Sequence, residues 1–110
     1  MQINKQACGA YETNCYILST QRGEFIIDPG VGALEFVKKH TKNPLAILNT
    51  HGHFDHIWDN AAVKKEFNIP LYIHKNDVFF LEDPFNQGFE KHKADVLIES
   101  EEPLELFCYH

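Results

Sequence analysis

Short apolar segments recur along the chain, and their lengths and flanking residues separate strands from helices. Short segments bounded by turn residues predict strands. They are residues 3–7, 14–19, 24–28, 45–48, 70–74, 96–98 and 104–109. The run Phe25-Ile26-Ile27 is apolar without interruption, which is typical of a strand covered on both faces. The turn Asp28-Pro29-Gly30 ends this strand, because Pro29 has no N–H group to donate to a ladder.

Longer segments place apolar residues at the spacing of a helix. Residues 33–42 combine an apolar stripe with lysines near the C-terminal end, where the helix dipole favours cations. Residues 57–67 carry a second stripe, and Asn76 is a predicted cap for a short helix through Leu81. Residues 83–93 predict an irregular surface loop. The alternation of short strands and helices predicts the α/β class.

Composition limits the size of the protein and its partners. The chain has 110 residues, which suits one domain rather than two. It has 10 Lys and Arg against 16 Asp and Glu, a formal net charge of −6. An acidic chain without a basic cluster is a poor candidate for nucleic-acid binding, so no nucleic-acid partner is expected.

The sequence also predicts a cytoplasmic location. Residues 1–6 contain no apolar run of the kind found in a signal peptide, and no segment approaches the length of a membrane span. We therefore expect no membrane partner. Cys8, Cys15 and Cys108 form no C-x-x-C pair, and such a sparse, odd set suits a reducing compartment. We expect them to be small buried apolar residues on strands.

The most informative segment is Thr50-His51-Gly52-His53-Phe54-Asp55-His56. Imidazole and carboxylate groups are good ligands for borderline cations such as zinc. Positions 51, 53 and 55 alternate, so in an extended loop these side chains would point to one side and His56 elsewhere. The loop would then present His51 and His53 to one metal, and Asp55 and His56 to a second. A polar loop with histidines clustered by chance is the alternative.

The pattern H-x-H-x-D-H resembles the metallo-β-lactamase superfamily, and within it the small hydrolases related to hydroxyacylglutathione hydrolase (glyoxalase II). Residues 14–18, 25–30 and 45–50 match further segments of that family in the expected order. The resemblance implies an αβ/βα sandwich, with two mixed sheets between outer helices.

The resemblance also implies a mechanism. In the complete family, two metals, usually zinc and sometimes iron or manganese, hold a hydroxide that attacks an ester, thioester or amide carbonyl. By this resemblance His51 and His53 bind the first metal, while Asp55 and His56 bind the second. Asp55 is also expected to orient the hydroxide as the catalytic residue. Asp28 is expected either to accept a hydrogen bond from a ligand histidine or its loop, or to serve the turn alone.

The resemblance covers the N-terminal half of the family's fold. Related hydrolases usually continue with Thr-Pro-Gly-His, and that histidine, a later aspartate and a final histidine complete the metal sites. By alignment, His110 matches the residue before this turn. We therefore expect residues 1–110 to be a single domain truncated before the third metal-ligand motif, inactive alone and weak in metal binding. An apolar sheet face left in water predicts self-association or pairing with the missing half.

Other functions remain open alongside a hydrolase acting on a small acyl or thioester substrate. One is a persulfide dioxygenase-like enzyme, which uses one iron on the same scaffold. Another is a non-catalytic fragment or interaction module whose histidine loop is vestigial.

The remaining histidines and aromatic residues predict mainly structural roles. His74 is expected to be hydrogen-bonded, His40 to lie near a helix C-terminus, and His92 to be solvated. Three aromatic side chains could line a substrate pocket, but packing in the core is the role expected of them. They are Tyr11, Phe54 and Trp58, of which Phe54 is the best pocket candidate because its neighbours are the expected ligands.

Overall fold

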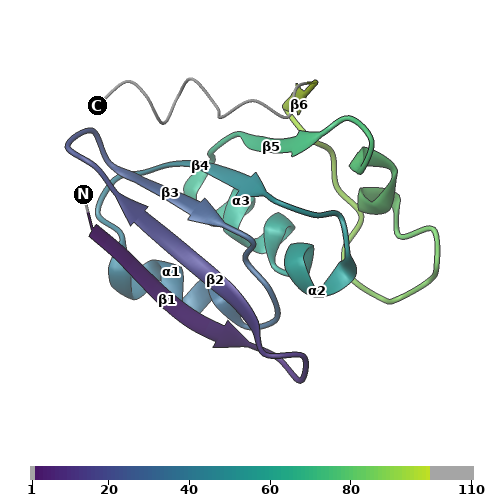
Figure 1. Ribbon diagram of the computed structural model, residues 1–110, viewed down its shortest axis with the longest axis horizontal. Coiled ribbons are helices and arrows are strands. Elements are labelled where there is room, and N and C mark those ends of the chain that lie inside the picture. The colour runs from purple at the N-terminus through teal and green to yellow at the C-terminus, as the bar shows by residue number, and fades with distance from the viewer. Residues whose placement is uncertain (1, 100–110) are drawn as a thin grey trace.

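The computed structural model describes residues 2–99 and shows a six-stranded sheet with strand order β1-β2-β3-β4-β5-β6 (Figure 1). The strands are β1 (Gln2–Cys8), β2 (Thr13–Ser19), β3 (Glu24–Ile27), β4 (Pro44–Asn49), β5 (Leu71–His74) and β6 (Val96–Ile98). The first three strands pair antiparallel, and β3 to β6 pair parallel. The helices are α1 (Ala33–His40), α2 (Phe54–Ile57), α3 (Asn60–Phe67) and the 3₁₀ helix η1 (Val78–Glu82). The predicted α/β class is confirmed.

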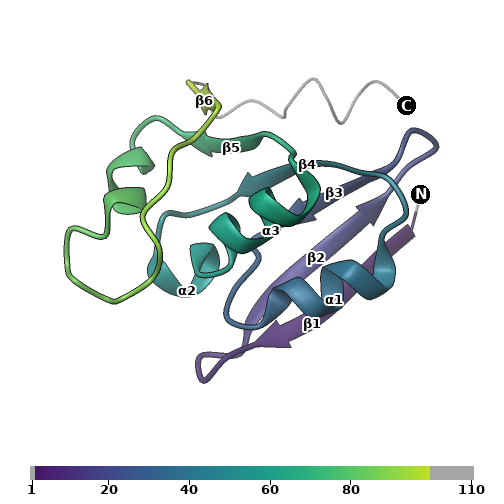
Figure 2. The same ribbon diagram turned by 180° about the vertical axis from the view of Figure 1, so that it is seen from behind.

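Helices α1 and α3 cover one face of the sheet, which Figure 2 shows from the helix side. Side chains alternate across the strands, so every second residue points into this layer. Cys15, Ile17, Ile26, Ile47 and Ile73 are fully buried there. Burying an aliphatic side chain of this size contributes about 1.5–3 kcal/mol. This layer is therefore the main core of the described residues.

The other face of the sheet is apolar as well. Leu18, Phe25, Ala46 and Leu48 form a second buried cluster, against which Tyr72 packs. Strand β3 contributes to both layers, which confirms that its apolar run belongs to a strand with two apolar faces. Such a sheet fits the middle of a layered sandwich, as the family resemblance implies.

The predicted helix at residues 57–67 is wrong in its boundaries, because the segment forms two helices. Helix α2 begins at Phe54, and Trp58 and Asp59 separate it from α3. The backbone N–H of Asp59 donates to the carbonyl of Pro29 (2.9 Å), and its Oδ2 accepts from the N–H of Leu34 (3.0 Å). These tertiary hydrogen bonds hold Asp59 between the helices, and a sequence pattern does not contain them.

Other boundaries differ by one turn or less. Helix α1 ends at His40, because Thr41 is extended and its hydroxyl donates to the carbonyl of Val37 (2.7 Å). The short helix predicted after Asn76 is a 3₁₀ helix preceded by Asp77. The irregular segment after it and strand β6 are confirmed, whereas the strand predicted at residues 104–109 lies outside the described residues. Within residues 2–99, no helix has the length and apolar character needed to cross a membrane.

A buried polar network connects the end of β4 to the start of α3 and to the irregular segment. The amides of Asn49 and Asn60 hydrogen-bond to each other in both directions (3.2 and 2.7 Å), and both side chains are buried. The Asn60 amide nitrogen also lies 3.0 Å from Nε2 of His92, and Nδ1 of His92 lies 2.8 Å from the carbonyl of Glu90. Since an amide nitrogen only donates, His92 accepts at Nε2 and carries its proton at Nδ1.

The expectation that His92 is solvated is therefore wrong. Its ring is partly buried and bonded at both nitrogens. Burial lowers the pKa of His92, and the charge of Lys64 acts in the same direction. The backbone of Glu90 and the carboxylates of Glu90 and Glu82 oppose this effect. The folded protein thus favours the neutral imidazole.

We predict that His92 contributes to loss of stability in acid. In the unfolded chain its pKa is near the ordinary value of about 6.5, so the unfolded state takes up a proton first as the pH falls. The contribution is complete above that value and is lost as the pH falls towards the lower pKa of the folded state. The variant H92Q keeps an acceptor for Asn60 and does not titrate, so its urea midpoint should fall less between pH 8 and pH 5. The exposed-residue control H40Q should behave as wild type, and an unchanged pH dependence in H92Q would contradict the assignment.

Candidate metal centre

The histidine segment lies where the parallel strands β3 and β4 end. Ile27 pairs with Leu48, so the residues that follow the two strands emerge side by side at one sheet edge. Asp28 follows β3, and Thr50 and His51 follow β4. Sites in open α/β sheets form at this carboxyl edge, because loops there leave the sheet together. The topology thus brings Asp28 to the histidine loop.

Asp28 is the buried acceptor at the base of this site. Its side chain is buried, and its φ of 53° places the backbone in the left-handed region, which aspartate tolerates better than most residues. Its carboxylate accepts hydrogen bonds from the Thr50 N–H (2.8 Å), from the Thr50 hydroxyl, and from Nδ1 of His56 (3.0 Å). The structure therefore gives Asp28 both expected bonds, one to the loop and one to a histidine.

The same network sets the orientation of two imidazole rings. The Thr50 hydroxyl donates to Asp28, so it is an acceptor for Nδ1 of His51 at 2.9 Å. His51 and His56 therefore both carry their protons at Nδ1, which leaves each Nε2 with a free lone pair. Their ring centroids are 4.8 Å apart. Two unprotonated nitrogens are thus held in one region by a single carboxylate.

His53 and Asp55 lie next to this pair. The ring of His53 stacks on that of His51 at 5.6 Å and lies 6.4 Å from that of His56. Oδ2 of Asp55 accepts a hydrogen bond from the hydroxyl of Thr13 (2.5 Å) and lies 3.7 Å from Nε2 of His56. The four residues predicted as metal ligands are therefore close together.

One part of the predicted geometry is wrong. His56 was expected to point away from the side shared by His51 and His53, but its ring lies beside that of His51. The extended loop ends at His53, and helix α2 begins at Phe54. Asp55 and His56 therefore lie in the first helical turn, where side chains do not alternate from side to side. The assignment of each ligand to a particular metal stays a prediction.

The donor set fits a divalent cation. Asp28, His51 and His56 each offer a ligand atom, and these atoms lie within 4.8 Å of one another. Because the carboxylate of Asp28 already accepts three hydrogen bonds, we assign it the role of orienting His56 rather than of a ligand. Imidazoles with a nearby carboxylate are the donors that zinc and iron prefer. His51 and His53 are exposed, and Asp55 and His56 are partly exposed, so a cation can reach them.

Glycines allow the ligand loop to pack tightly against its neighbours. A Cβ atom on Gly52 would lie 2.5 Å from the ring of Phe80 and 2.7 Å from the carbonyl of Asp77. The N–H of Gly52 donates to Oδ2 of Asp77 (3.2 Å), which attaches the loop to the turn before η1. A Cβ atom on Gly30 would lie 2.6 Å from the carbonyl of Asp55. The loop is therefore packed against backbone on two sides.

Sequence reasoning did not identify three residues that position the site. Thr13 bonds Asp55 across 42 positions, and Asp77 bonds Gly52 across 25 positions. No local pattern marks such partners. Thr50 directly precedes His51, and a hydroxyl beside a ligand histidine is the one signal that could have identified it.

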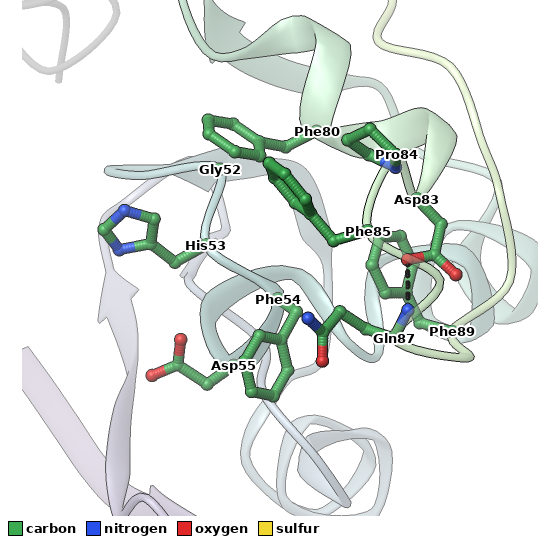
Figure 3. Close-up of a pocket in the computed structure, with 10 residues that line it drawn as sticks. All are labelled: Gly52, His53, Phe54, Asp55, Phe80, Asp83, Pro84, Phe85, Gln87 and Phe89. Carbon is green, nitrogen blue, oxygen red and sulfur yellow. Dashed lines mark hydrogen bonds between the residues drawn. The ribbon is translucent and has the colours of Figure 1, made fainter.

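A cavity of about 280 Å³ opens beside His53 and Asp55 (Figure 3). Its lining is Gly52, His53, Phe54, Asp55, Phe80, Asp83, Pro84, Phe85, Gln87 and Phe89. Phe54 therefore lines a pocket, as the sequence predicted when it favoured Phe54 over Tyr11 and Trp58. Trp58 contacts two of these lining residues, with its ring 6.2 Å from that of Phe54 and 5.9 Å from that of Phe89. Tyr11 is 68% exposed and meets Phe54 edge-on, so it is not a core residue.

The other singled-out residues have structural environments. Nδ1 of His74 accepts a hydrogen bond from the N–H of Asn76 (3.1 Å), and His40 is exposed beside the ring of Phe36. Cys8 and Cys15 are buried and form no disulfide, and burial raises the pKa of both thiols. They match the small buried apolar residues expected, while Cys108 lies outside the described residues.

Two curated proteins resemble the chain to different extents. "Probable metallo-hydrolase YqgX" of Bacillus subtilis is 31% identical over 121 residues, which cover 100% of this chain and 57% of that protein. "Hydroxyacylglutathione hydrolase" of Nitrosomonas eutropha is 36% identical over 64 residues, which cover 56% of this chain and 25% of that protein. The chain spans between 40% and 57% of the length of the most similar curated relatives.

Solved structures show the same fold. The BLEG-1 B3 metallo-beta-lactamase superposes with a TM-score of 0.82 and 33% identity, covering 94% of this chain and 56% of that one. TTHA1623 in a di-iron-bound form superposes with a TM-score of 0.75 and 27% identity, covering 92% of this chain and 56% of that one. The profile of the family described as "Metallo-beta-lactamase superfamily" matches residues 8–107. With its strand-end cluster of histidines and this match across nearly all its length, the chain belongs to the metallo-beta-lactamase superfamily.

Proposed function

We propose that the full-length protein carrying this chain is a metal-dependent hydrolase that acts on a small acyl substrate, with a thioester as the first class to test. One observation carries the proposal. The carboxylate of Asp28 fixes the proton of His56 at Nδ1 directly and that of His51 through the Thr50 hydroxyl. Both Nε2 atoms therefore keep a lone pair, and that of His56 lies 3.7 Å from Oδ2 of Asp55. A merely polar loop has no need for this arrangement.

Each residue has a distinct task in this proposal. His51, His53, Asp55 and His56 hold the metal ions, while Asp28 and Thr50 keep two of the rings in position. Bound metal would supply a water of lowered pKa and a Lewis acid for the carbonyl oxygen. The hydroxyl of Thr13 holds one oxygen of Asp55, which leaves the other oxygen to orient a reactant. Asp55 is thus the proposed catalytic residue.

The choice of metal and substrate rests on relatives. Zinc suits the imidazole and carboxylate donors, and the di-iron form of TTHA1623 supports iron as the alternative. The short match to a hydroxyacylglutathione hydrolase supports a thioester. The expectations of a cytoplasmic location, and of self-association or pairing with a further half, stay predictions.

We predict that alanine at His51 or His56 removes metal from the full-length protein. Each variant removes an imidazole whose Nε2 is kept unprotonated by the hydrogen bonds to Asp28 and Thr50. Metal content, measured by plasma mass spectrometry, should therefore fall well below that of the wild-type protein. Hydrolysis of S-acyl thioesters should fall with it. The variant H40A changes an exposed histidine outside the cluster and should keep both properties. Full metal content in H51A and H56A would refute the proposed centre, while metal without thioester hydrolysis would refute only the substrate class.

We predict that Asp28→Asn weakens metal binding without removing a ligand. The amide has one acceptor oxygen for three donors, so the rings of His51 and His56 lose their common anchor. Loss of such a supporting hydrogen bond typically costs about 10–100-fold in metal affinity, measurable by competition with a chelating dye. The control D95N changes an aspartate that accepts from the Leu71 N–H (2.8 Å) and from Lys64 (2.9 Å), away from the loop. Equal affinities in D28N and D95N would show that Asp28 does not orient the ligands.

A further inference from the structure

The cavity beside the metal centre is an aromatic pocket formed by two segments. Gly52 to Asp55 form the wall next to the ligands, and η1 with residues 83–89 forms the opposite wall (Figure 3). The rings of Phe80 and Phe85 lie 6.2 Å apart in a tilted arrangement. An apolar cavity of about 150 Å³ already holds benzene, so this one has room for an aryl group with a short substituent.

Polar groups in the lining are mostly engaged by the protein itself. The carboxylate of Asp83 accepts from the N–H groups of Gln87 (2.6 Å) and Gly88 (2.9 Å), so it shapes the loop. Asp55 is bonded to Thr13. Among the residues that the structure describes, the lining contains no lysine or arginine, and its other polar side chains are the imidazole of His53 and the amide of Gln87. A carboxylate placed among the phenylalanines, away from the metals, would lose hydration without a lysine or arginine among the described lining residues to pair with it, which is unfavourable.

The pocket is also continuous with the proposed centre. His53 and Asp55 belong to both, since they line the cavity and stand among the expected ligands. A group bound among the phenylalanines would therefore lie next to two of the expected metal ligands.

We propose that this pocket binds an uncharged aryl or branched-alkyl group of the substrate and disfavours groups that carry a carboxylate. The placement of that group next to the scissile bond rests on the proposed function. The preference of the pocket for uncharged groups over carboxylates does not depend on it. Phe85 is the specificity residue that can be tested most cleanly. It is 64% exposed, so its removal should leave the fold intact.

Trp58 provides a reporter for occupancy of the pocket. It packs against Phe54 and Phe89, and a Cβ atom on Gly88 would lie 3.9 Å from its ring. It is the single tryptophan of this chain, and W58F supplies the background for any tryptophan elsewhere in the full-length protein. Its fluorescence should change when a ligand enters between the phenylalanine rings.

The test compares acetophenone with 4-acetylbenzoate in the full-length protein after metal removal by chelation. Neither probe can be hydrolysed, and without metal the carboxylate probe cannot bind as a ligand. Acetophenone should bind saturably and more tightly than 4-acetylbenzoate. In Phe85→Ala its affinity should fall by about fivefold or more, as expected for loss of one aromatic contact. Ile3→Ala is the control, because Ile3 is an exposed apolar residue of β1 that does not line the pocket.

A second variant tests the charge argument. Gln87→Lys adds a cation at an exposed lining position and should strengthen 4-acetylbenzoate binding by about two- to fivefold at low salt. The proposal is overturned if acetophenone does not saturate, if I3A and F85A lose affinity equally, or if the wild-type protein binds the carboxylate probe more tightly. Because metal is absent from these titrations, failure of the pocket is separate from failure of the proposed hydrolase, which metal content and thioester hydrolysis report.

Discussion

The buried carboxylate of Asp28 is the group on which the arrangement of this site depends. A buried charge is costly unless it is hydrogen-bonded, and here three donors from Thr50 and His56 surround it. Those donors come from the end of β4 and from α2, so one acceptor that follows β3 joins three separate parts of the chain around the site. The same bonds decide which nitrogen of each imidazole is free. Local folding and metal chemistry thus share a single requirement.

The order of the strands in the sheet brings these donors to the carboxylate of Asp28. Parallel pairing of β3 and β4 brings Asp28 and Thr50 to the same edge, and the antiparallel strand β2 places Thr13 beside Asp55. On the far side of the loop, the amide pair of Asn49 and Asn60 fixes the end of β4 against α3. Buried amides that satisfy each other are costly to separate, because either one alone would be unpaired. The ligand loop is therefore held from both ends.

How much of this the sequence predicts depends on the distance between partners. The ligands lie within six positions, so their residue types and order can be read directly from the sequence, and the turn Asp28-Pro29-Gly30 marks Asp28. The break between α2 and α3 is not visible, because Asp59 is held by Pro29 and Leu34 from elsewhere in the chain. The residues around His92 have the composition of a surface loop, yet its ring accepts a hydrogen bond from Asn60, which lies 32 positions away. The direction of His56 was misjudged for a related reason, since the helix begins earlier than its apolar stripe indicates.

The pocket and the centre are not independent, and Phe80 connects them. Its ring meets that of His53 at 6.0 Å and occupies the space where a Cβ atom on Gly52 would lie. A change of size at Phe80 therefore alters the loop that carries the ligands as well as the cavity. The three atoms nearest to that Cβ position belong to Phe80 and Asp77 rather than to Phe85, and most of the surface of Phe85 is exposed. Substrate preference can therefore vary at Phe85 while the packing beneath the histidines stays the same, whereas variation at Phe80 has to be matched by the loop itself.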